Sequence, residues 1–347
     1  MSMGSGLLVV DKPQGVTSHD VVAAVRRVLH TKHVGHAGTL DPMATGVLVV
    51  GFGSATRLLN YIVGSDKTYE TTIRLGRSTT TDDADGEFLP LSVGEYTTTA
   101  DVVRLISDDD IRAAASRQTG DIMQVPSSYS AKKIHGQKAY DMARNGEDVK
   151  LAPHEVTISE FTILGIARHE VDAAYGPMPV IDVDARITCS TGTYIRAIGR
   201  DMGADLGVGG YLTRLRRVRV GSFDAGDPMV VTAHAEPHTF INRAGERITH
   251  QRAVLDIDDP EALQSKALTP AQGAQRAMPV MQVTPAQAEF LVHGRFIDGV
   301  VHEPTAAICH VSPSMSHAHD GMEDWLVAIV ERGSRTQLKP SVVFIDH

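Results

Sequence analysis

The sequence has little of what stabilises secreted or membrane-bound proteins. Only two of its 347 residues are cysteines, Cys189 and Cys309, and a large chain with two thiols is not a disulfide scaffold. The strongest apolar runs, residues 7–10 and 47–50, have the length of strands and are far too short to span a bilayer. The N-terminus lacks the charged start and long apolar stretch of a secretory signal. We therefore expect a protein of the reducing cytoplasm.

The chain also lacks the excess of basic residues that is usual in proteins that bind nucleic acid. Its formal net charge is -9 at pH 7, which argues against bulk electrostatic binding to nucleic acid. Acidic residues concentrate at 82–85, 108–110 and 256–261, whereas basic residues concentrate at 132–138 and 214–219. Two interpretations stay open: a basic face on an acidic protein, or ordinary solvated surface charge.

Signatures for nucleotide or metal binding are missing as well. Gly51-Phe52-Gly53 lacks the remaining positions of either phosphate-binding glycine pattern. His30, His33 and His36 recur every three residues, but no cysteine or acidic residue accompanies them at a recognisable ligand spacing. The sequence therefore predicts no cofactor and no metal.

Apolar periodicity indicates a mixture of strands and helices. Residues 7–10 and 47–50 have the length of buried strands, and residues 69–75 and 181–187 alternate as half-buried strands do. Residues 18–29 and 194–206 have helical character. Because strands and helices do not alternate regularly, the order predicts an α+β fold with a mixed, mainly antiparallel sheet.

Changes in composition suggest where the domains end. The helical and strand periods fade from about residue 230 to 275, where Ala, Gln, Pro and Asp increase. Order returns from Pro279 onward. We predict a large domain at 1–230, a linker or insertion of unknown structure at 231–278, and a small β-rich domain at 279–347.

The segment from Gly35 to Gly46 is the first that could carry chemistry. It places one carboxylate, Asp41, in a short loop with three glycines, a histidine and a proline, directly before an apolar strand. Pro42 restricts Asp41 to an extended conformation, and a carboxylate held at the mouth of a strand suits nucleophilic or general-base work. The alternative is an aspartate that closes a turn by binding nearby backbone N–H groups.

Two other segments offer candidate side chains. Tyr69 is either a ring that stacks on a base or a core aromatic, because it shares a strand face with Ile73. Arg196 stands near the start of a helix, where the helix dipole disfavours a cation. Such an arginine usually has a carboxylate or phosphate partner, although an ordinary surface arginine is the other interpretation.

Several segments, in the right order, resemble those of one family, the bacterial tRNA pseudouridine-55 synthases known as TruB. Residues 35–46 resemble its catalytic loop and 8–18 its N-terminal motif, while 65–69 and 192–196 resemble its other two active-site motifs. Residues 125–144 and, more loosely, 212–218 also match. At the C-terminus, residues 284–295, 325–330 and 338–344 resemble a PUA-type RNA-binding domain.

The resemblance implies that uridine 55 in the T-loop of tRNA is isomerised to pseudouridine by base flipping, cleavage of the glycosidic bond and reattachment through C5. The catalytic positions it implies are Asp41, Tyr69 and Arg196. The substrate-binding positions are Lys12, His36, Tyr194 and Leu212. The basic residues expected to contact RNA are Lys132, Lys133, Arg214, Arg216 and Arg217.

The implied reaction redistributes bonds within one nucleotide and so needs no redox cofactor, metal or nucleoside triphosphate. The expected partner is the T-stem-loop of tRNA. Neither a membrane nor an obligate protein partner is expected, and the chain is expected to act as a monomer.

Two departures from the family pattern concern RNA contacts: Ser127 replaces a common proline, and Lys132 a common apolar residue. Residues 237–278 match no known segment. Two further functions stay open, an RNA-binding or RNA-folding module with an inactive site, and a metal-dependent hydrolase that uses Asp41 and the nearby histidines.

Overall fold

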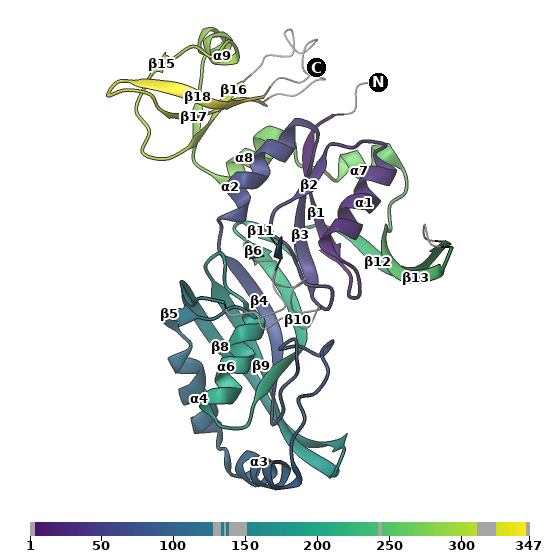
Figure 1. Cartoon of the computed structure of the whole chain (residues 1–347). Coiled ribbons are helices and arrows are strands. Elements are labelled where there is room, and N and C mark those ends of the chain that lie inside the picture. The colour runs from purple at the N-terminus through teal and green to yellow at the C-terminus, as the bar shows by residue number, and fades with distance from the viewer. Residues whose placement is uncertain are drawn as a thin grey trace. The chain divides into compact units, whose positions relative to one another are not determined.

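The computed structural model describes residues 4–127, 151–241, 245–310 and 324–344, together with the backbone of 133–134 and 137–138. The chain forms two compact units (Figure 1). The terminal unit combines residues 1–65 with 219–347, and the central unit comprises 66–218. This division differs from the predicted domain at 1–230, because the first strand pairs with a strand more than two hundred residues later. Pairing between such distant segments leaves no local signal in a sequence.

The sheet of the terminal unit is built around β1 (Gly6–Lys12). β1 runs antiparallel to β3 (Thr45–Phe52), and β2 (Val34–His36) pairs antiparallel with the C-terminal residues 50–52 of β3. On its second edge β1 runs parallel to β12 (Val231–Ile241), which pairs antiparallel with β13 (Arg247–Leu255). Both β1 and β3 therefore lie inside the sheet.

β1 is apolar on both faces because both of its faces are covered. Leu8 and Val10 pack with α1 (Ser18–Val28), whereas Leu7 and Val9 pack into a second cluster on the opposite face. This second cluster includes residues of η1 (Gly53–Leu58), α2 (Leu59–Val63) and the segment after β11 (Phe223–Asp224). A strand covered on both faces has a continuous apolar run rather than alternation, and this explains the sequence at 7–10.

Residues 231–278, for which the sequence suggested a linker or an insertion of unknown structure, form regular secondary structure. They form β12, β13, α7 (Pro260–Ser265) and α8 (Pro270–Ala277). Each helix begins with proline at its first position and is capped by the preceding Asp259 or Thr269, which is a strong local start signal. The helices are short and the strands mix His, Thr and Ala, so neither shows a helical or strand periodicity of apolar residues long enough to be recognised in the sequence.

A separate five-stranded sheet lies near the C-terminus of the terminal unit, in the order β14-β16-β17-β18-β15. Its strands are β14 (Val280–Gln282), β15 (Ile297–Asp298), β16 (Thr305–His310), β17 (Asp324–Arg332) and β18 (Gln337–Val343), with α9 (Pro285–Val292) beside them. Ala307, Val327 and Val330 form a core with Leu291 of α9. Ile308 and Ile329 join the cluster that contains Leu7, so this sheet has two packed faces.

The central unit contains a sheet in the order β10-β4-β9-β8-β5. Its strands are β4 (Lys67–Leu75), β5 (Gly120–Gln124), β8 (His154–Ala173), β9 (Gly176–Cys189) and β10 (Gly210–Val220), the last of which continues into the terminal unit. The helices are α3 (Val93–Leu105), α4 (Asp108–Arg117) and α6 (Ile195–Asp205). β4, β5 and β8 each meet their neighbour in antiparallel register. The expected α+β class with a mainly antiparallel sheet is confirmed.

One basic segment predicted to contact RNA falls largely outside this description. Lys132 lies outside the described residues. Lys133 belongs to β6 (Lys133–Ile134), which pairs with β7 (Gln137–Lys138), and only its backbone is described. Among the described residues, no helix combines the length and the apolar character needed to traverse a bilayer.

α6 approaches the start of β10 so closely that Gly203 has no room for a side chain. A Cβ at this position would lie 2.1 Å from the carbonyl carbon of Gly209 and 2.2 Å from the nitrogen of Gly210. We predict that Gly203→Ala lowers the free energy of unfolding by about 1–3 kcal/mol, because backbone must move to admit the methyl group. Urea unfolding followed by circular dichroism measures the effect.

Gly94→Ala is the matched control. Gly94 lies in α3 with nothing within 4 Å of an added Cβ, so alanine should leave stability unchanged or raise it by about 0.5–1 kcal/mol. Equal unfolding midpoints for the two variants would contradict the close approach at Gly203.

Candidate active site

Asp41 lies in the loop at 37–44, between the paired strands β2 and β3. Gly38 and Gly46 lie on either side of Asp41 and have φ of 92° and 103°, a region that residues with a Cβ rarely adopt. The N–H of Ala37 donates to the carbonyl of Val49 at 2.9 Å, and the N–H of Ala44 donates to the carbonyl of Asp41 at 3.1 Å. Main-chain bonds therefore close this turn, and Asp41 itself is partly exposed.

The backbone is held immediately on both sides of Asp41. Before it, the N–H of Leu40 donates to the buried hydroxyl of Ser18 at 2.8 Å, and this hydroxyl lies 3.2 Å from the carbonyl of Leu40. After it, the carbonyl of Pro42 accepts from the N–H of Gly15 at 2.8 Å and from Nζ of Lys12 at 3.3 Å. The N-terminal motif at 8–18 thus fixes the main chain of the Asp41 loop.

Lys12 has a different place from the substrate-binding one that the resemblance implied. Its side chain is fully buried, and Nζ also donates to the carbonyls of Val16 at 2.7 Å and Pro13 at 3.0 Å. A buried ammonium is very costly unless acceptors surround it, and three backbone carbonyls supply them here. Lys12 is therefore a positioning residue that ties the turn at 13–16 to Pro42.

His36 ends β2 and lies one residue before the loop. Its ring meets that of His19 on α1 edge to face, with centroids 5.4 Å apart. His36 is partly exposed and pairs with Val50 in the β2–β3 register. The terminal unit thus contains Lys12, His36 and Asp41 of the predicted site.

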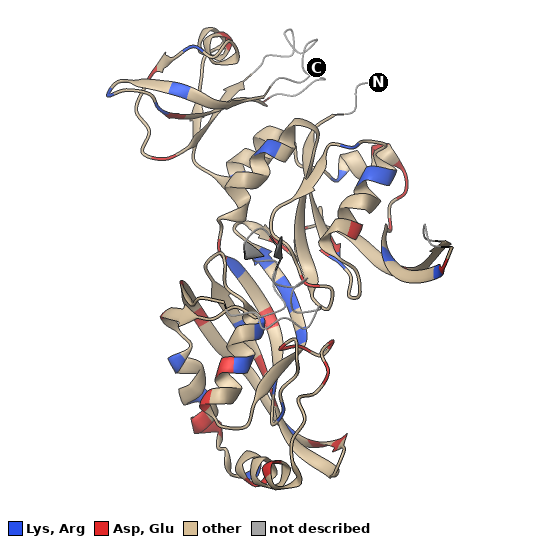
Figure 2. Ribbon diagram, in the orientation of Figure 1, with Lys and Arg blue, Asp and Glu red and all other residues tan. Residues whose placement is uncertain are grey.

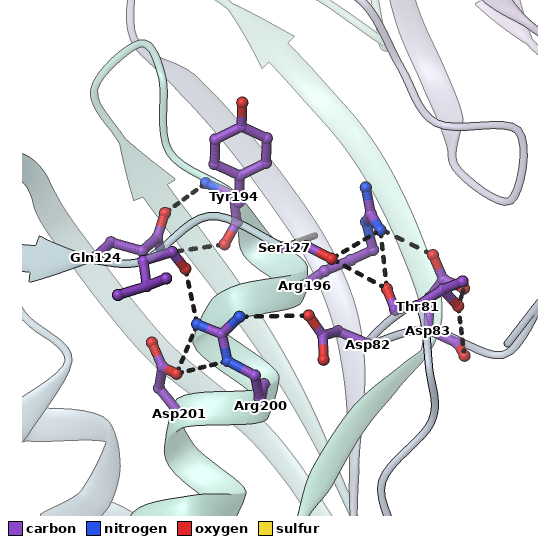
Figure 3. Close-up of polar contacts among 10 residues, drawn as sticks. Thr81, Asp82, Asp83, Gln124, Ser127, Tyr194, Arg196, Arg200 and Asp201 are labelled. Atoms are coloured by element: carbon purple, nitrogen blue, oxygen red, sulfur yellow. Dashed lines mark hydrogen bonds and ion pairs between the residues drawn. The ribbon is translucent and has the colours of Figure 1, made fainter. Parts of the chain in front are cut away.

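Arg196 is the second residue of α6 in the central unit, and it is buried rather than on the surface. It is 4% exposed, which excludes the ordinary surface arginine. Figure 3 shows its guanidinium among Thr81, Ser127 and Asp83. Nη1 donates to the carbonyl of Thr81 at 2.8 Å and to the hydroxyl of Ser127 at 3.3 Å, while Nε lies 3.5 Å from a carboxylate oxygen of Asp83.

Asp83 is the carboxylate partner that sequence reasoning missed. It belongs to the acidic run at 82–85, which the sequence could not distinguish from solvated charge, yet only 4% of it is exposed. Its carboxylate accepts from the hydroxyl of Thr81 at 2.5 Å and from the N–H of Asp85 at 3.1 Å. Asp83 also bridges to Leu212 at the start of β10. Arg196, Asp83 and Leu212 are therefore neighbours.

Ser127 adds a contact that a proline at this position would not make. Ser127 is fully buried, and its hydroxyl lies 3.4 Å from the carbonyl of Thr81 as well as beside Nη1 of Arg196. The departure from the family pattern therefore lies directly against the buried guanidinium and supplies a hydroxyl to it.

A second arginine of α6, Arg200, binds the same two segments as Arg196. Arg200 lies 3.4 Å from the carboxylate of Asp82, and its other nitrogens bind Asp201 and the carbonyl of Val125 (Figure 3). Burial raises the pKa of Asp82. Tyr194, the residue that precedes α6, exchanges two hydrogen bonds with the buried amide of Gln124, at 2.8 and 3.1 Å. The N-terminus of α6 is thereby fixed to β5.

Tyr69 lies on β4 opposite Ile187 of β9 and is 8% exposed. Lys67 is two residues earlier, so it shares this strand face, and it is buried as well. Burial and the charge of Arg217 lower the pKa of Lys67 to about 8, while burial raises the pKa of the Cys189 thiol to about 11. The face that carries Tyr69 therefore also carries a buried lysine, which is paired across the sheet with a buried cysteine.

Arg217 does not share the exposed face predicted for the basic cluster of β10. It is 1% exposed, and strand alternation directs it to the face opposite Arg214 and Arg216. Arg214 is half exposed and pairs with Asp184 at 3.4 Å and with the hydroxyl of Thr72 at 3.2 Å. Figure 2 shows both acidic and basic residues in the central unit. Because Arg217 is buried, Arg214 and Arg216 remain of the three residues of β10 predicted to contact RNA.

The residues of the predicted site are divided between the two units. Lys12, His36 and Asp41 belong to the terminal unit. Tyr69, Tyr194, Arg196 and Leu212 belong to the central unit. Within the described ranges, no group of three or more His, Cys, Asp or Glu side chains is arranged to hold a metal ion.

Comparison with known proteins identifies the family. A model of the N-terminal domain of the TruB family pseudouridylate synthases matches residues 26–195, which include the Asp41 loop and Tyr69. The tRNA pseudouridine synthase B of Bifidobacterium longum (strain DJO10A) is 48% identical over 98% of each chain. That of Thermobifida fusca (strain YX) is 45% identical over 99% of each chain. The chain belongs to the TruB family of pseudouridylate synthases.

Solved structures show the fold over the same extent. The chain in a structure of an H/ACA RNP bound to a substrate RNA containing 2′-deoxyuridine has a TM-score of 0.62 at 19% identity. A chain of a Cbf5-Nop10-Gar1 complex has the same score at 20% identity, and each match covers 99% of this chain and 85% of the other. The terminal and central units carry the pseudouridine synthase fold. The sheet from β14 to β18 is the small PUA-like domain.

The bonds on either side of Asp41 lead to a prediction for Ser18. Ser18→Ala removes the hydroxyl that binds the backbone of Leu40, so we expect the free energy of unfolding to fall by about 1–2 kcal/mol. Turnover should fall as well, because the main chain before Asp41 is released. Urea unfolding and steady-state kinetics on the same samples measure both quantities.

Ser107→Ala is the control for Ser18→Ala. Ser107 caps α4 in the central unit, so its loss should cost about 1 kcal/mol of stability without touching the Asp41 loop. Comparable destabilisation with full turnover in both variants would show that the loop does not depend on Ser18.

Proposed function

We propose that this protein isomerises uridine 55 in the T-loop of tRNA to pseudouridine, with Asp41 as the catalytic carboxylate. One observation carries the proposal: the backbone on each side of Asp41 is bound by buried groups of a separate segment, Ser18 and Lys12. An aspartate that served only a turn would not require such support. The family relationship and the names of the relatives support the substrate.

Binding comes first in the proposed reaction. A base inside a folded loop is accessible only after it is extruded, which costs a few kcal/mol of stacking. We assign Tyr69 to stack on the extruded uracil, a contact worth about 1–3 kcal/mol. Leu212 and Tyr194 contact the base, and His36 holds the rearranged loop after the base has left it.

The chemical step redistributes bonds within one nucleotide. Asp41 either adds to C1′ of the ribose or assists loss of the 2′ proton, and the glycosidic bond from C1′ to N1 breaks. The uracil then turns, and a bond forms between C5 and C1′ while the Asp41 carboxylate leaves C1′ or, on the other route, the 2′ proton returns. C5 finally loses its proton, and N1 gains one. Substrate and product therefore have the same atoms, and the step needs no cofactor.

Arg196 is assigned to pair with Asp41 and orient it. Its own surroundings support a positioning role, because Thr81, Ser127 and Asp83 hold the guanidinium within the central unit. A guanidinium fixed in advance loses little conformational entropy when it binds a carboxylate. The proposed active enzyme is a cytoplasmic monomer that acts on tRNA without a membrane or an obligate protein partner.

The proposal predicts that Asp41→Asn abolishes pseudouridine formation and leaves tRNA binding within about twofold of the original, because a single carboxylate performs the chemistry. Mass spectrometry of a T-stem-loop transcript after labelling of pseudouridine measures the product, and filter binding measures affinity. Incubation with a chelator should leave wild-type turnover unchanged, whereas a metal-dependent hydrolase would lose it.

Asp109→Asn is the matched control, since the Asp109 carboxylate is 92% exposed and pairs only across the surface of α4. It should retain full activity. Normal turnover by Asp41→Asn would overturn the assignment, and absence of turnover by the wild-type chain would leave an RNA-binding module.

The role of Tyr69 can be divided between its ring and its hydroxyl. We also propose that the Tyr69 hydroxyl assists loss of the C5 proton. Tyr69→Phe keeps the stacking surface but removes this hydroxyl, so we expect kcat to fall at least tenfold with KM unchanged. Tyr69→Leu removes the ring and should raise KM as well. Full activity of Tyr69→Phe would leave stacking as the sole role of this residue.

A further inference from the structure

β12 and β13 form a two-stranded ribbon that extends past the strand to which β12 is paired (Figure 1). β12 pairs with β1 only at Val231 and Thr232, whereas its pairing with β13 continues to Ile241. We call residues 237–241 and 245–251 the arm. The four steps from Pro237 to Ile241 alone span about 13 Å of extended chain.

The arm leaves the sheet at the end of the strands where the Asp41 loop also lies. β12 runs parallel to β1, so both strands end in the same direction, and the last residue of β1, Lys12, lies opposite Gly46 at the start of β3. A side-chain carbon on Gly15 would lie 3.9 Å from Cγ of Gln251. The base of the arm therefore adjoins the turn whose N–H binds Pro42.

One face of the arm carries a cluster of rings. His238 and Phe240 stack with centroids 6.2 Å apart and planes inclined by 19°, and His250 meets them edge to face at 5.5 and 5.4 Å. His250 lies directly across the ladder from His238, and Ile248 lies across from Phe240. Phe240 is 40% exposed. Together these rings present flat, partly solvated surface.

We propose that the arm binds RNA next to the target nucleotide by stacking of its rings on unpaired bases. This inference rests on the proposed function. Stacking on aromatic rings is a general means of holding single-stranded or loop nucleotides. The arm starts at the same end of the strands as the Asp41 loop, so its rings are available to an RNA whose target nucleotide reacts at Asp41.

The position of the arm favours RNA over a protein partner. The arm starts beside the turn whose Gly15 N–H donates to the carbonyl of Pro42, the residue after Asp41. The arm contains one arginine, Arg247, and one glutamate, Glu246, so its formal charge is zero, whereas the whole chain carries -9. The arm therefore adds no net repulsion toward a polyanion.

The first test compares Phe240→Leu, which removes the ring but keeps an apolar side chain, with Phe240→Trp, which keeps a stacking surface. Filter binding to full-length tRNA and steady-state kinetics are measured for each. We expect the leucine variant to raise Kd and KM about five- to thirtyfold with kcat unchanged. The tryptophan variant should bind as tightly as the wild type.

The matched control is on the opposite face of the same ribbon. Thr239 and Thr249 face each other there, with hydroxyls 2.8 Å apart, and Thr239→Ala with Thr249→Ala should leave Kd within twofold. Circular dichroism melts of all variants establish that the fold is kept. A similar loss of affinity in this control would indicate a general role of the ribbon and overturn the assignment to the rings.

The two proposals fail in different ways. If wild-type protein binds tRNA but forms no pseudouridine, the proposed function fails while the comparison of Kd values still tests the arm. If the wild type is active and Phe240→Leu matches it in Kd and KM, the arm does not bind RNA. Association of the wild type with a purified protein that Phe240→Leu abolishes, at unchanged tRNA affinity, would assign the arm to a protein partner.

Discussion

The Asp41 loop depends on the hydrogen bonds that the buried ammonium of Lys12 donates to main-chain carbonyls. An ammonium without acceptors would be strongly unfavourable inside the sheet, and its three carbonyl partners come from two separate segments, the turn at 13–16 and Pro42. Satisfying this one charge therefore fixes the turn and the loop relative to each other. Ser18 adds the bonds on the other side of Asp41. The backbone around Asp41 consequently has few conformations to lose when substrate binds.

The central unit applies the same principle to Arg196. The guanidinium is buried at the start of a helix, where the dipole alone would disfavour a cation. The carboxylate of Asp83, the carbonyl of Thr81 and the hydroxyl of Ser127 compensate for this, and they come from two segments, 81–83 and the stretch at Ser127, that both lie far from Arg196 in the chain. Charged groups in both units are thus held by local polar partners before any substrate arrives. Such preorganisation is what electrostatic catalysis requires.

The solved structures at 19–20% identity share the fold with TM-scores of 0.62. The fold can persist while most side chains change, because many of the contacts that shape the site are made by the main chain. The Asp41 loop is closed by main-chain bonds, and Lys12 binds main-chain carbonyls. Main-chain acceptors are present whatever the side chain. The ribbon of β12 and β13, by contrast, presents mainly side chains.

The sequence by itself determined the α+β class, the strands at 7–10 and 47–50, and the placement of Asp41 in a glycine-flanked loop, because these are written in short runs of neighbouring residues. Only the tertiary structure decided that Asp83 is buried beside Arg196, that Arg217 lies inside the protein, and that residues 231–278 fold onto the first strand. Burial of a charge and pairing of distant strands depend on what another part of the chain places beside them. No local pattern contains that information.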